Sequence, residues 1–296
     1  MQVKRVQAQP QATAEAVRLV HLAHATGQSN QLYAIFESLE QLAPARSLGL
    51  GLLAYEAFLV SGTQADFVRA ESQIRSALAV ASDDPYALAG AILLYLARGA
   101  TTPSYLELVR KLCDQNRPPS AEVLTACAQV SFAVGNPTRG NDRYRDAVEH
   151  DPELFPAWLL WGKQALAAGR IEQAAHHFEQ ASATPLPSLQ YAAFLGLGAA
   201  KFLQRDFQAA AQAYNAAANA RAHGKKIVPT SMPAALQYNL GLVLAQQPGK
   251  EVQNSAIEWL SAYLDNSDAL PERRLRARQI VERLRRRWHP GQKPSP

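Results

Sequence analysis

Residues 158–181 read WLLWGKQALAAGRIEQAAHHFEQA, and their spacing of large and small side chains recurs along the chain. The pattern stands 34 residues earlier, where Tyr144 takes the place of Phe178, and returns 36 residues later, where Tyr214 does so. A period in the thirties with this distribution is typical of stacked helix–turn–helix units. The repeat therefore predicts an architecture before any site chemistry is considered.

Turn residues and prolines divide most of the chain into helix pairs. Asp84-Pro85 opens one pair and Asp151-Pro152 closes another, because proline ends helices and suits a first turn. Gly135 and Gly169 let the chain reverse within a few residues. The expected pairs cover residues 12–43, 46–81, 84–117, 120–151, 153–184, 188–221 and 233–266, and an unpaired last helix covers 271–288.

Residues 120–221 resemble the tetratricopeptide repeat (TPR) family, through Trp158, Gly162, Ala174, Phe178 and Ala181 and their counterparts one period away. The resemblance implies an all-α, right-handed α–α superhelix, a TPR-like solenoid of about seven helix pairs with a C-terminal capping helix. The domains expected on this basis are a flexible N-terminus (1–11), a helical repeat domain (12–268), a basic amphipathic capping helix (270–288) and a disordered tail (289–296).

Composition places the chain among folded proteins. It has 296 residues with 48% hydrophobic content, and a solenoid of this length buries each repeat against its neighbours. No run of 18 apolar residues is present, and the N-terminal residues lack the apolar core of a secretory signal. We predict a cytoplasmic location, with a mature form that has lost its leader as the alternative. The Ala, Leu and Arg content is compatible with a bacterial source.

The two cysteines, Cys113 and Cys127, stand among apolar residues on expected helices. We interpret them as small buried side chains. A disulfide would require the two adjacent helices to bring them within reach. Two cysteines so placed indicate neither a metal site nor a disulfide framework.

Catalytic and metal-binding constellations are not evident in the sequence. His21 and His24 share a helix face but have no third ligand close in sequence. His176 and His177 are adjacent on a helix and so point in different directions. We therefore expect no enzyme activity and no catalytic residues, metal, cofactor or small-molecule substrate.

The TPR resemblance implies that a partner peptide or helix binds in the concave groove lined by the first helix of each pair. The groove positions are mostly apolar, which suits an amphipathic helix or an extended apolar segment. A carboxylate clamp is not expected, because only Lys163 and Asn239 fit one. The expected partner contacts are Phe132, Leu159, Lys163, Phe202, Tyr238 and Asn239.

The last helix combines an apolar face with a high density of arginine. Ala277, Val281, Leu284 and Trp288 fall on one face, which predicts a helix that caps the array. Residues 272–287 contain eight arginines and two glutamates, which gives this segment a net charge of +6. The whole chain has a net charge of +5, so the remainder of the chain carries −1. The arginines are Arg273, Arg274, Arg276, Arg278, Arg283, Arg285, Arg286 and Arg287.

These arginines favour one of two interpretations. By default they form a solvated outer face. The sharper hypothesis is a contact surface for an acidic partner protein, a nucleic acid or an anionic membrane. The predicted function is thus a non-enzymatic protein-interaction scaffold or adaptor, and the alternative is recruitment to nucleic acid or an anionic membrane through the last helix.

Overall fold

The computed structural model describes residues 12–26, 28–39, 43–61, 63–99, 103–113, 120–185, 187–222 and 224–288. The chain divides into two compact units, Met1–Ala157 and Trp158–Pro296, here called the N-terminal unit and the C-terminal unit. The residues predicted to be a flexible N-terminus and a disordered tail lie outside the described part of the chain.

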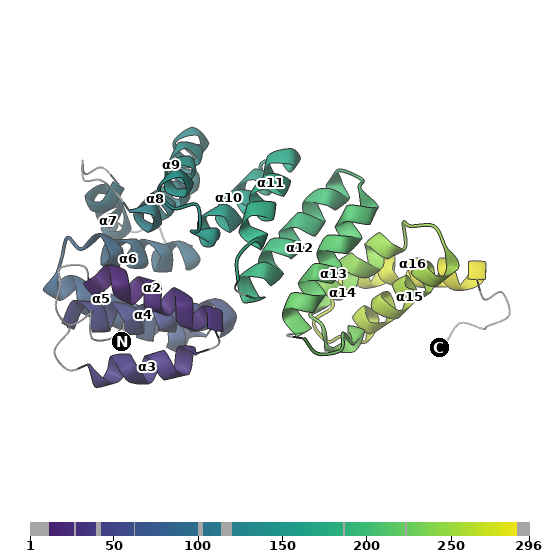
Figure 1. The fold of residues 1–296 in the computed structure, drawn as a ribbon, viewed down its shortest axis with the longest axis horizontal. Helices are drawn as coiled ribbons and strands as arrows, with labels where there is room; N and C mark the ends of the chain where they lie inside the picture. Colours follow the sequence, from purple (N-terminus) through teal and green to yellow (C-terminus); the bar gives the residue numbers. More distant parts are fainter. Residues whose placement is uncertain are drawn as a thin grey trace. The chain divides into compact units, whose positions relative to one another are not determined.

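The N-terminal unit is built from four helix pairs (Figure 1). Their bounds are α2 (Ala12–Thr26) and α3 (Ser29–Ser38), α4 (Ala43–Ser61) and α5 (Gln64–Val80), α6 (Pro85–Ala97) and α7 (Pro103–Cys113), and α8 (Ala121–Ala133) and α9 (Pro137–His150). The third pair opens with a side-chain cap, because the carboxylate of Asp84 accepts from the backbone N–H groups of Tyr86 and Ala87 at the start of α6.

The C-terminal unit holds most of the fifth pair, the sixth and seventh pairs and one further helix. Their bounds are α10 (Phe155–Ala167) and α11 (Ile171–Ser182), α12 (Pro187–Leu203) and α13 (Phe207–Ala222), the 3-10 turn η1 (Pro229–Ser231), α14 (Ala234–Leu244) and α15 (Lys250–Asp265), and α16 (Pro271–Trp288). The prediction of seven helix pairs followed by one unpaired helix is confirmed over the described residues.

In the third to sixth pairs, one residue after the first helix lies in the left-handed region and helps to reverse the chain. Gly135 and Gly169 have φ of 78° and 71°, which glycine adopts without steric cost. Arg205 takes the same place in the sixth pair at φ 61°, an uncommon conformation for a residue with a Cβ. Asp206 follows it and accepts a hydrogen bond from the N–H of Ala209, which caps α13.

Large rings fill the spaces opened by small residues, as the repeat predicted. The ring of Phe178 lies only 2.8 Å from the position that a Cβ atom on Gly162 would occupy, which leaves no room for that atom. One repeat later the ring of Tyr214 occupies the same place against Gly198, at 2.6 Å. Both rings are buried. In the fifth and sixth pairs the two helices therefore approach closely because the first helix carries no side chain at the contact.

We expect Gly198→Ala to destabilise the protein by about 1–2 kcal/mol. The added methyl group would displace Tyr214, an overpacking cost that exceeds the better helix propensity of alanine. Gly90 in α6 is the matched control, because a Cβ there would meet its nearest atom, in Leu52, at an ordinary 3.4 Å. Gly90→Ala should stabilise by about 0.5–1 kcal/mol. Denaturant unfolding measures both changes, and equal stability of the two variants would contradict the packing argument.

Candidate functional site

The two expected groove residues on α10 lie in different environments. Leu159 is 6% exposed and packs in the core of the fifth pair with Phe178. Lys163 is exposed, and partial desolvation of its ammonium group lowers its pKa below the ordinary value. Of these two side chains, only Lys163 is accessible enough to contact a partner.

On α12, the expected residue Phe202 is half-buried, with its ring 5.6 Å from that of Phe207. The next residue, Leu203, is 56% exposed and was not among the expected contacts. Ala199 and Leu195 are half-buried one and two turns before Leu203 on the same helix. An apolar stripe thus runs along α12 towards its C-terminal end.

The two expected residues on α14 belong partly to the core. Tyr238 is 6% exposed, its ring lies 5.1 Å from that of Tyr263, and the guanidinium of Arg273 lies 5.3 Å from its centroid. Asn239 is half-buried. Tyr238 and Phe202 pack into the same apolar cluster, so the structure brings these two predicted residues together.

Phe132 lies on α8 in the N-terminal unit and is half-buried. Its ring occupies the space beside Gly140 and lies 6.0 Å from the ring of Tyr144 on α9. This ring fills the space between the two helices of its pair. Contact of Phe132 and the other five residues with a partner stays a prediction.

The terminal helix α16 is held at both ends by hydrogen bonds. The guanidinium of Arg274 donates to three backbone carbonyls, those of Ala269, Leu264 and Asn266, at 3.1, 2.7 and 2.6 Å. These bonds satisfy carbonyl groups at and beyond the C-terminal end of α15. At the other end, Nε1 of Trp288 donates to the amide oxygen of Gln253 at 2.6 Å. Between them, Ala277, Ile280, Val281 and Leu284 are buried in the cluster that α16 forms with α14 and α15.

The remaining arginines of α16 point away from this core. Arg276, Arg278, Arg283, Arg286 and Arg287 are exposed, and Arg285 is half-buried. The eight arginines predicted as one basic surface therefore divide into two packed side chains, Arg273 and Arg274, and six at or near the surface.

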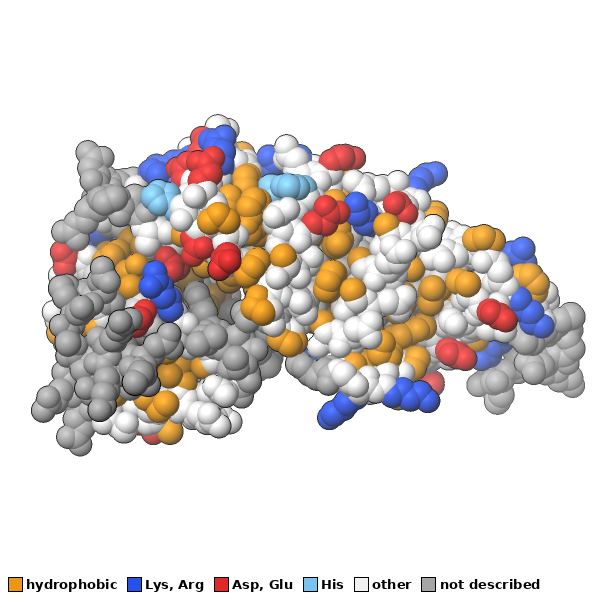
Figure 2. All heavy atoms as spheres, viewed as in Figure 1, with side chains coloured by type: hydrophobic (Ala, Val, Ile, Leu, Met, Phe, Trp, Pro, Cys, Tyr) orange, Lys and Arg blue, Asp and Glu red, His pale blue; other side chains and the backbone are white. Residues whose placement is uncertain are grey.

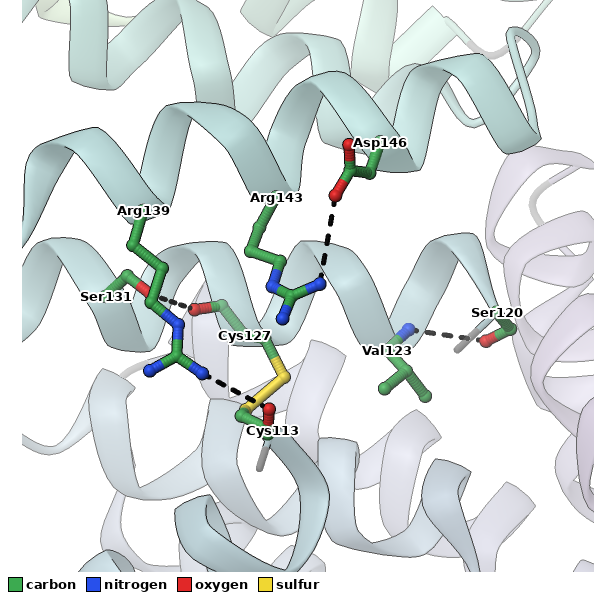
Figure 3. The surroundings of a disulfide bond; sticks show 8 residues. All are labelled: Cys113, Ser120, Val123, Cys127, Ser131, Arg139, Arg143 and Asp146. Atoms are coloured by element: carbon green, nitrogen blue, oxygen red, sulfur yellow. Dashed lines mark hydrogen bonds and ion pairs between the residues drawn. A yellow bond between two sulfur atoms is a disulfide. The ribbon is translucent and has the colours of Figure 1, made fainter. Parts of the chain in front are cut away.

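The interpretation of Cys113 and Cys127 as small buried side chains is wrong. The two residues form a disulfide, with their Cα atoms 5.6 Å apart (Figure 3). The bond joins the last residue of α7 to the middle of α8. The sequence could not show this, because the pairing depends on how the third helix pair packs against the fourth.

Polar contacts surround the disulfide (Figure 3). Arg139 on α9 donates to the backbone carbonyl of Cys113 at 3.3 Å, and the hydroxyl of Ser131 donates to the carbonyl of Cys127 at 2.8 Å. Ser120 caps α8 by accepting from the N–H of Val123. Near the disulfide, the hydrogen bond of Arg139 therefore links α9 to the end of α7, while the bonds of Ser131 and Ser120 lie within α8 and its cap.

A cluster of aromatic rings joins α10 to α11. The imidazole of His177 stacks on Trp161 with 3.9 Å between centroids and is 5.7 Å from Trp158. Its Nδ1 is buried with no hydrogen-bond partner among the described residues. Burial, and then the charges of His176 and Arg170, lower the pKa of His177 from 6.5 to about 4. His177 is therefore neutral at physiological pH.

Charged side chains line a hollow of about 310 Å³ between α5, α6 and α7. They form pairs along their own helices: Arg75 bonds Glu71 at 2.8 Å, and Lys111 lies 3.5 Å from Glu107. In the described residues no group of three His, Cys, Asp or Glu side chains is placed to hold a metal ion. Nor does any described helix have the length and apolar character needed to cross a membrane.

Comparison with known proteins gives the class of the fold. No protein-family model and no curated protein matches the chain. Among solved structures, the Cut9–Hcn1 hetero-tetramer of the APC/C matches with a TM-score of 0.63 and 16% identity over 90% of this chain. The match covers 48% of the Cut9–Hcn1 chain, so this protein spans about half of that length.

Two further structures support the same class. Pseudomonas aeruginosa PilF matches with a TM-score of 0.53 and 17% identity, over 70% of this chain and 93% of PilF. The human IFIT1 dimer with m7Gppp-AAAA matches with a TM-score of 0.56 and 13% identity, over 96% of this chain and 66% of IFIT1. The chain has a tetratricopeptide-repeat-like fold, and at these identities the likeness concerns the fold alone.

We predict that acid destabilises the protein through His177. Its folded pKa of about 4 lies below the ordinary 6.5, so between these values the unfolded chain binds a proton that the folded chain does not. Stability should fall as pH drops from 6.5 towards 4, by up to roughly 3 kcal/mol. In His177→Phe, which retains a stacking ring, this contribution should vanish. Urea unfolding across pH measures it.

The neighbouring His176 is the control for this prediction. His176 is exposed and its charge contributes less than burial to the lowered pKa of His177, so His176→Gln should keep most of the pH dependence of the unmodified protein. If His177→Phe also keeps that dependence between pH 6.5 and 4, the assignment to His177 is wrong.

Proposed function

We propose that the protein is a non-enzymatic scaffold that binds a segment of a partner protein along the first helices of its C-terminal unit. The observation that carries the proposal is the incompletely covered apolar stripe of α12, from Leu195 through Ala199 and Phe202 to the exposed Leu203. An amphipathic helix or an extended apolar segment suits such a surface. Lys163 and Asn239 supply polar handles on the neighbouring first helices α10 and α14.

The surface composition supports binding to a protein. Figure 2 shows hydrophobic side chains on the visible face of the C-terminal unit, with few charged side chains among them in its middle part. Helical repeats present preformed surfaces of this kind, so a flexible partner segment bears most of the ordering cost.

The paired charges in the hollow of the N-terminal unit support a function without catalysis. A catalytic acid or base must reach a substrate, whereas the Glu71 and Glu107 carboxylates there are each engaged with a cation. The proposed scaffold is accordingly one without a cofactor, metal or small-molecule substrate.

Recruitment to nucleic acid through α16 is the alternative. The IFIT1 structures hold PPP-AAAA and m7Gppp-AAAA, but that protein shares 13–15% identity with this chain. On α16, two of the eight arginines are packed against protein groups, which leaves fewer for phosphates. We therefore favour the protein scaffold.

The double variant Lys163→Glu/Leu203→Glu tests the groove. Both side chains are exposed, so the fold should persist, while introduced carboxylates oppose an apolar partner. We expect affinity capture from the native host with mass spectrometry to lose the partner. Leu159 and Tyr238 are unsuitable targets because their burial would turn a binding test into a folding test.

A matched control makes the same chemical changes elsewhere in the unit. Lys226→Glu/Val228→Glu also replaces an exposed lysine and an exposed apolar side chain. It should retain every partner of the unmodified protein. If both double variants capture the same proteins as the unmodified chain, the groove assignment fails.

The disulfide bears on where the scaffold acts. Disulfides persist in oxidising compartments and are rare in the cytosol. We infer that the chain works in an oxidising compartment, which favours the leader-processed alternative over the cytoplasmic prediction. Cys113 and Cys127 are the only cysteines in the sequence, so the oxidised chain has no free thiol.

Thiol trapping in the native host tests this inference. Cells are denatured in the presence of an alkylating reagent, and the protein mass is measured before and after reduction. We expect no added alkyl group before reduction and two after it, one for each cysteine. Two alkyl groups without reduction would place the protein in a reducing compartment.

A further inference from the structure

The backbone of the terminal helix α16 is held in place at both ends and along its buried face. Arg274, in the first turn of α16, donates hydrogen bonds to backbone carbonyls around the end of α15. Trp288, the last residue of α16, donates a hydrogen bond to Gln253. Its apolar face is buried between these points. Side chains on the opposite face are therefore presented by a backbone that is already ordered, which lowers the cost of binding.

The arginines on the exposed face of α16 are regularly spaced. Arg276 and Arg283 are seven residues apart, as are Arg278 and Arg285, so each pair recurs after about two helical turns, roughly 10 Å. On a helical wheel these two rows flank Leu275, which is 63% exposed. Between the two basic rows lie Leu275, Gln279 and the ion pair of Glu282 with Arg286, so the edges of this surface are basic and its centre is mixed.

An anionic membrane fits this surface poorly. An amphipathic helix binds a bilayer by inserting its apolar face into the interface. In α16 that face packs against α14 and α15 through Ala277, Ile280, Val281 and Leu284. Only Leu275 of α16 remains as a large exposed apolar side chain in the described part of the helix.

Nucleic acid also fits less well than protein. The exposed face includes the carboxylates of Glu272 and Glu282, and Glu282 lies 3.7 Å from Arg286. These carboxylates oppose phosphates and peptide carboxylates alike, so they do not decide between the two kinds of partner. Trp288 is half-buried and hydrogen-bonded to Gln253, so it does not offer the open stacking face that single-stranded bases use.

We propose that α16 binds an acidic helical segment of a partner protein through Arg276, Arg278, Arg283 and Leu275. Carboxylates at i and i+7 of the segment match the arginine rows, and a leucine between them covers Leu275. The site is separate from the groove on α12, so it adds a second surface to the scaffold.

Binding to a synthetic peptide tests the proposal. The probe is a helical peptide of about 20 residues with Glu at i and i+7 on both sides of a leucine stripe. Its counterpart has every Glu replaced by Gln. Fluorescence anisotropy with the full chain should show binding of the Glu peptide, weakening as salt rises from about 50 to about 300 mM. The Gln peptide should not bind.

Two sets of variants locate the binding. Arg276→Gln/Arg278→Gln/Arg283→Gln should weaken the affinity for the Glu peptide about tenfold. The matched control removes the same charge from three exposed lysines, Lys225, Lys226 and Lys250, and should stay within about twofold. All six side chains are exposed, so thermal unfolding should be unchanged in both variants.

Competing ligands decide between classes of partner. A single-stranded oligonucleotide with the net charge of the Glu peptide, and vesicles with about one third phosphatidylserine, are titrated under the same conditions. Tighter binding of either one than of the Glu peptide overturns the proposal. So does an equal loss of affinity in the lysine control, or no binding of the Glu peptide. The groove variant Lys163→Glu/Leu203→Glu should bind the Glu peptide normally, which separates failure of this site from failure of the groove.

Discussion

The close approach of two helices within a pair is the constraint on which the rest of the fold depends. Tyr214 and Phe178 can lie between their helices only because Gly198 and Gly162 have no side chain there. This contact sets the spacing of the pair, and the spacing determines which residues face the next pair. The offset of 36 residues between Phe178 and Tyr214 therefore reflects the same steric requirement in the fifth and sixth pairs.

Arginine serves three physical purposes on one helix. Arg274 satisfies backbone carbonyls, Arg273 lies over the ring of Tyr238, and five of the others are exposed to solvent. Each of these guanidinium groups carries the same positive charge. The net charge of α16 therefore cannot separate a packed arginine from one that is free to contact a partner. The planar fork of the guanidinium explains why this residue type suits each role.

The predicted groove illustrates how far sequence reasoning reaches. Its helices were placed correctly, but Leu159 and Tyr238 are buried, whereas the exposed Leu203 was not predicted. Tyr238 is covered because α16, some forty residues later, contributes Arg273 and the apolar side chains of its buried face. A signal for Leu203 existed, since it extends the stripe of Leu195 and Ala199, but its exposure depends on what covers the end of α12.

The sequence by itself determined the all-α class, the order and approximate bounds of the helix pairs and the unpaired terminal helix, although α4 begins at Ala43 rather than at the expected residue 46. These follow from local periodicity, capping residues and turns, which act over a few residues. Only the tertiary structure decided that Cys113 bonds Cys127, that His177 is buried neutral, and which arginines of α16 are packed. Each of these depends on contacts between segments from different helices, and the period of the repeat carries no information about them.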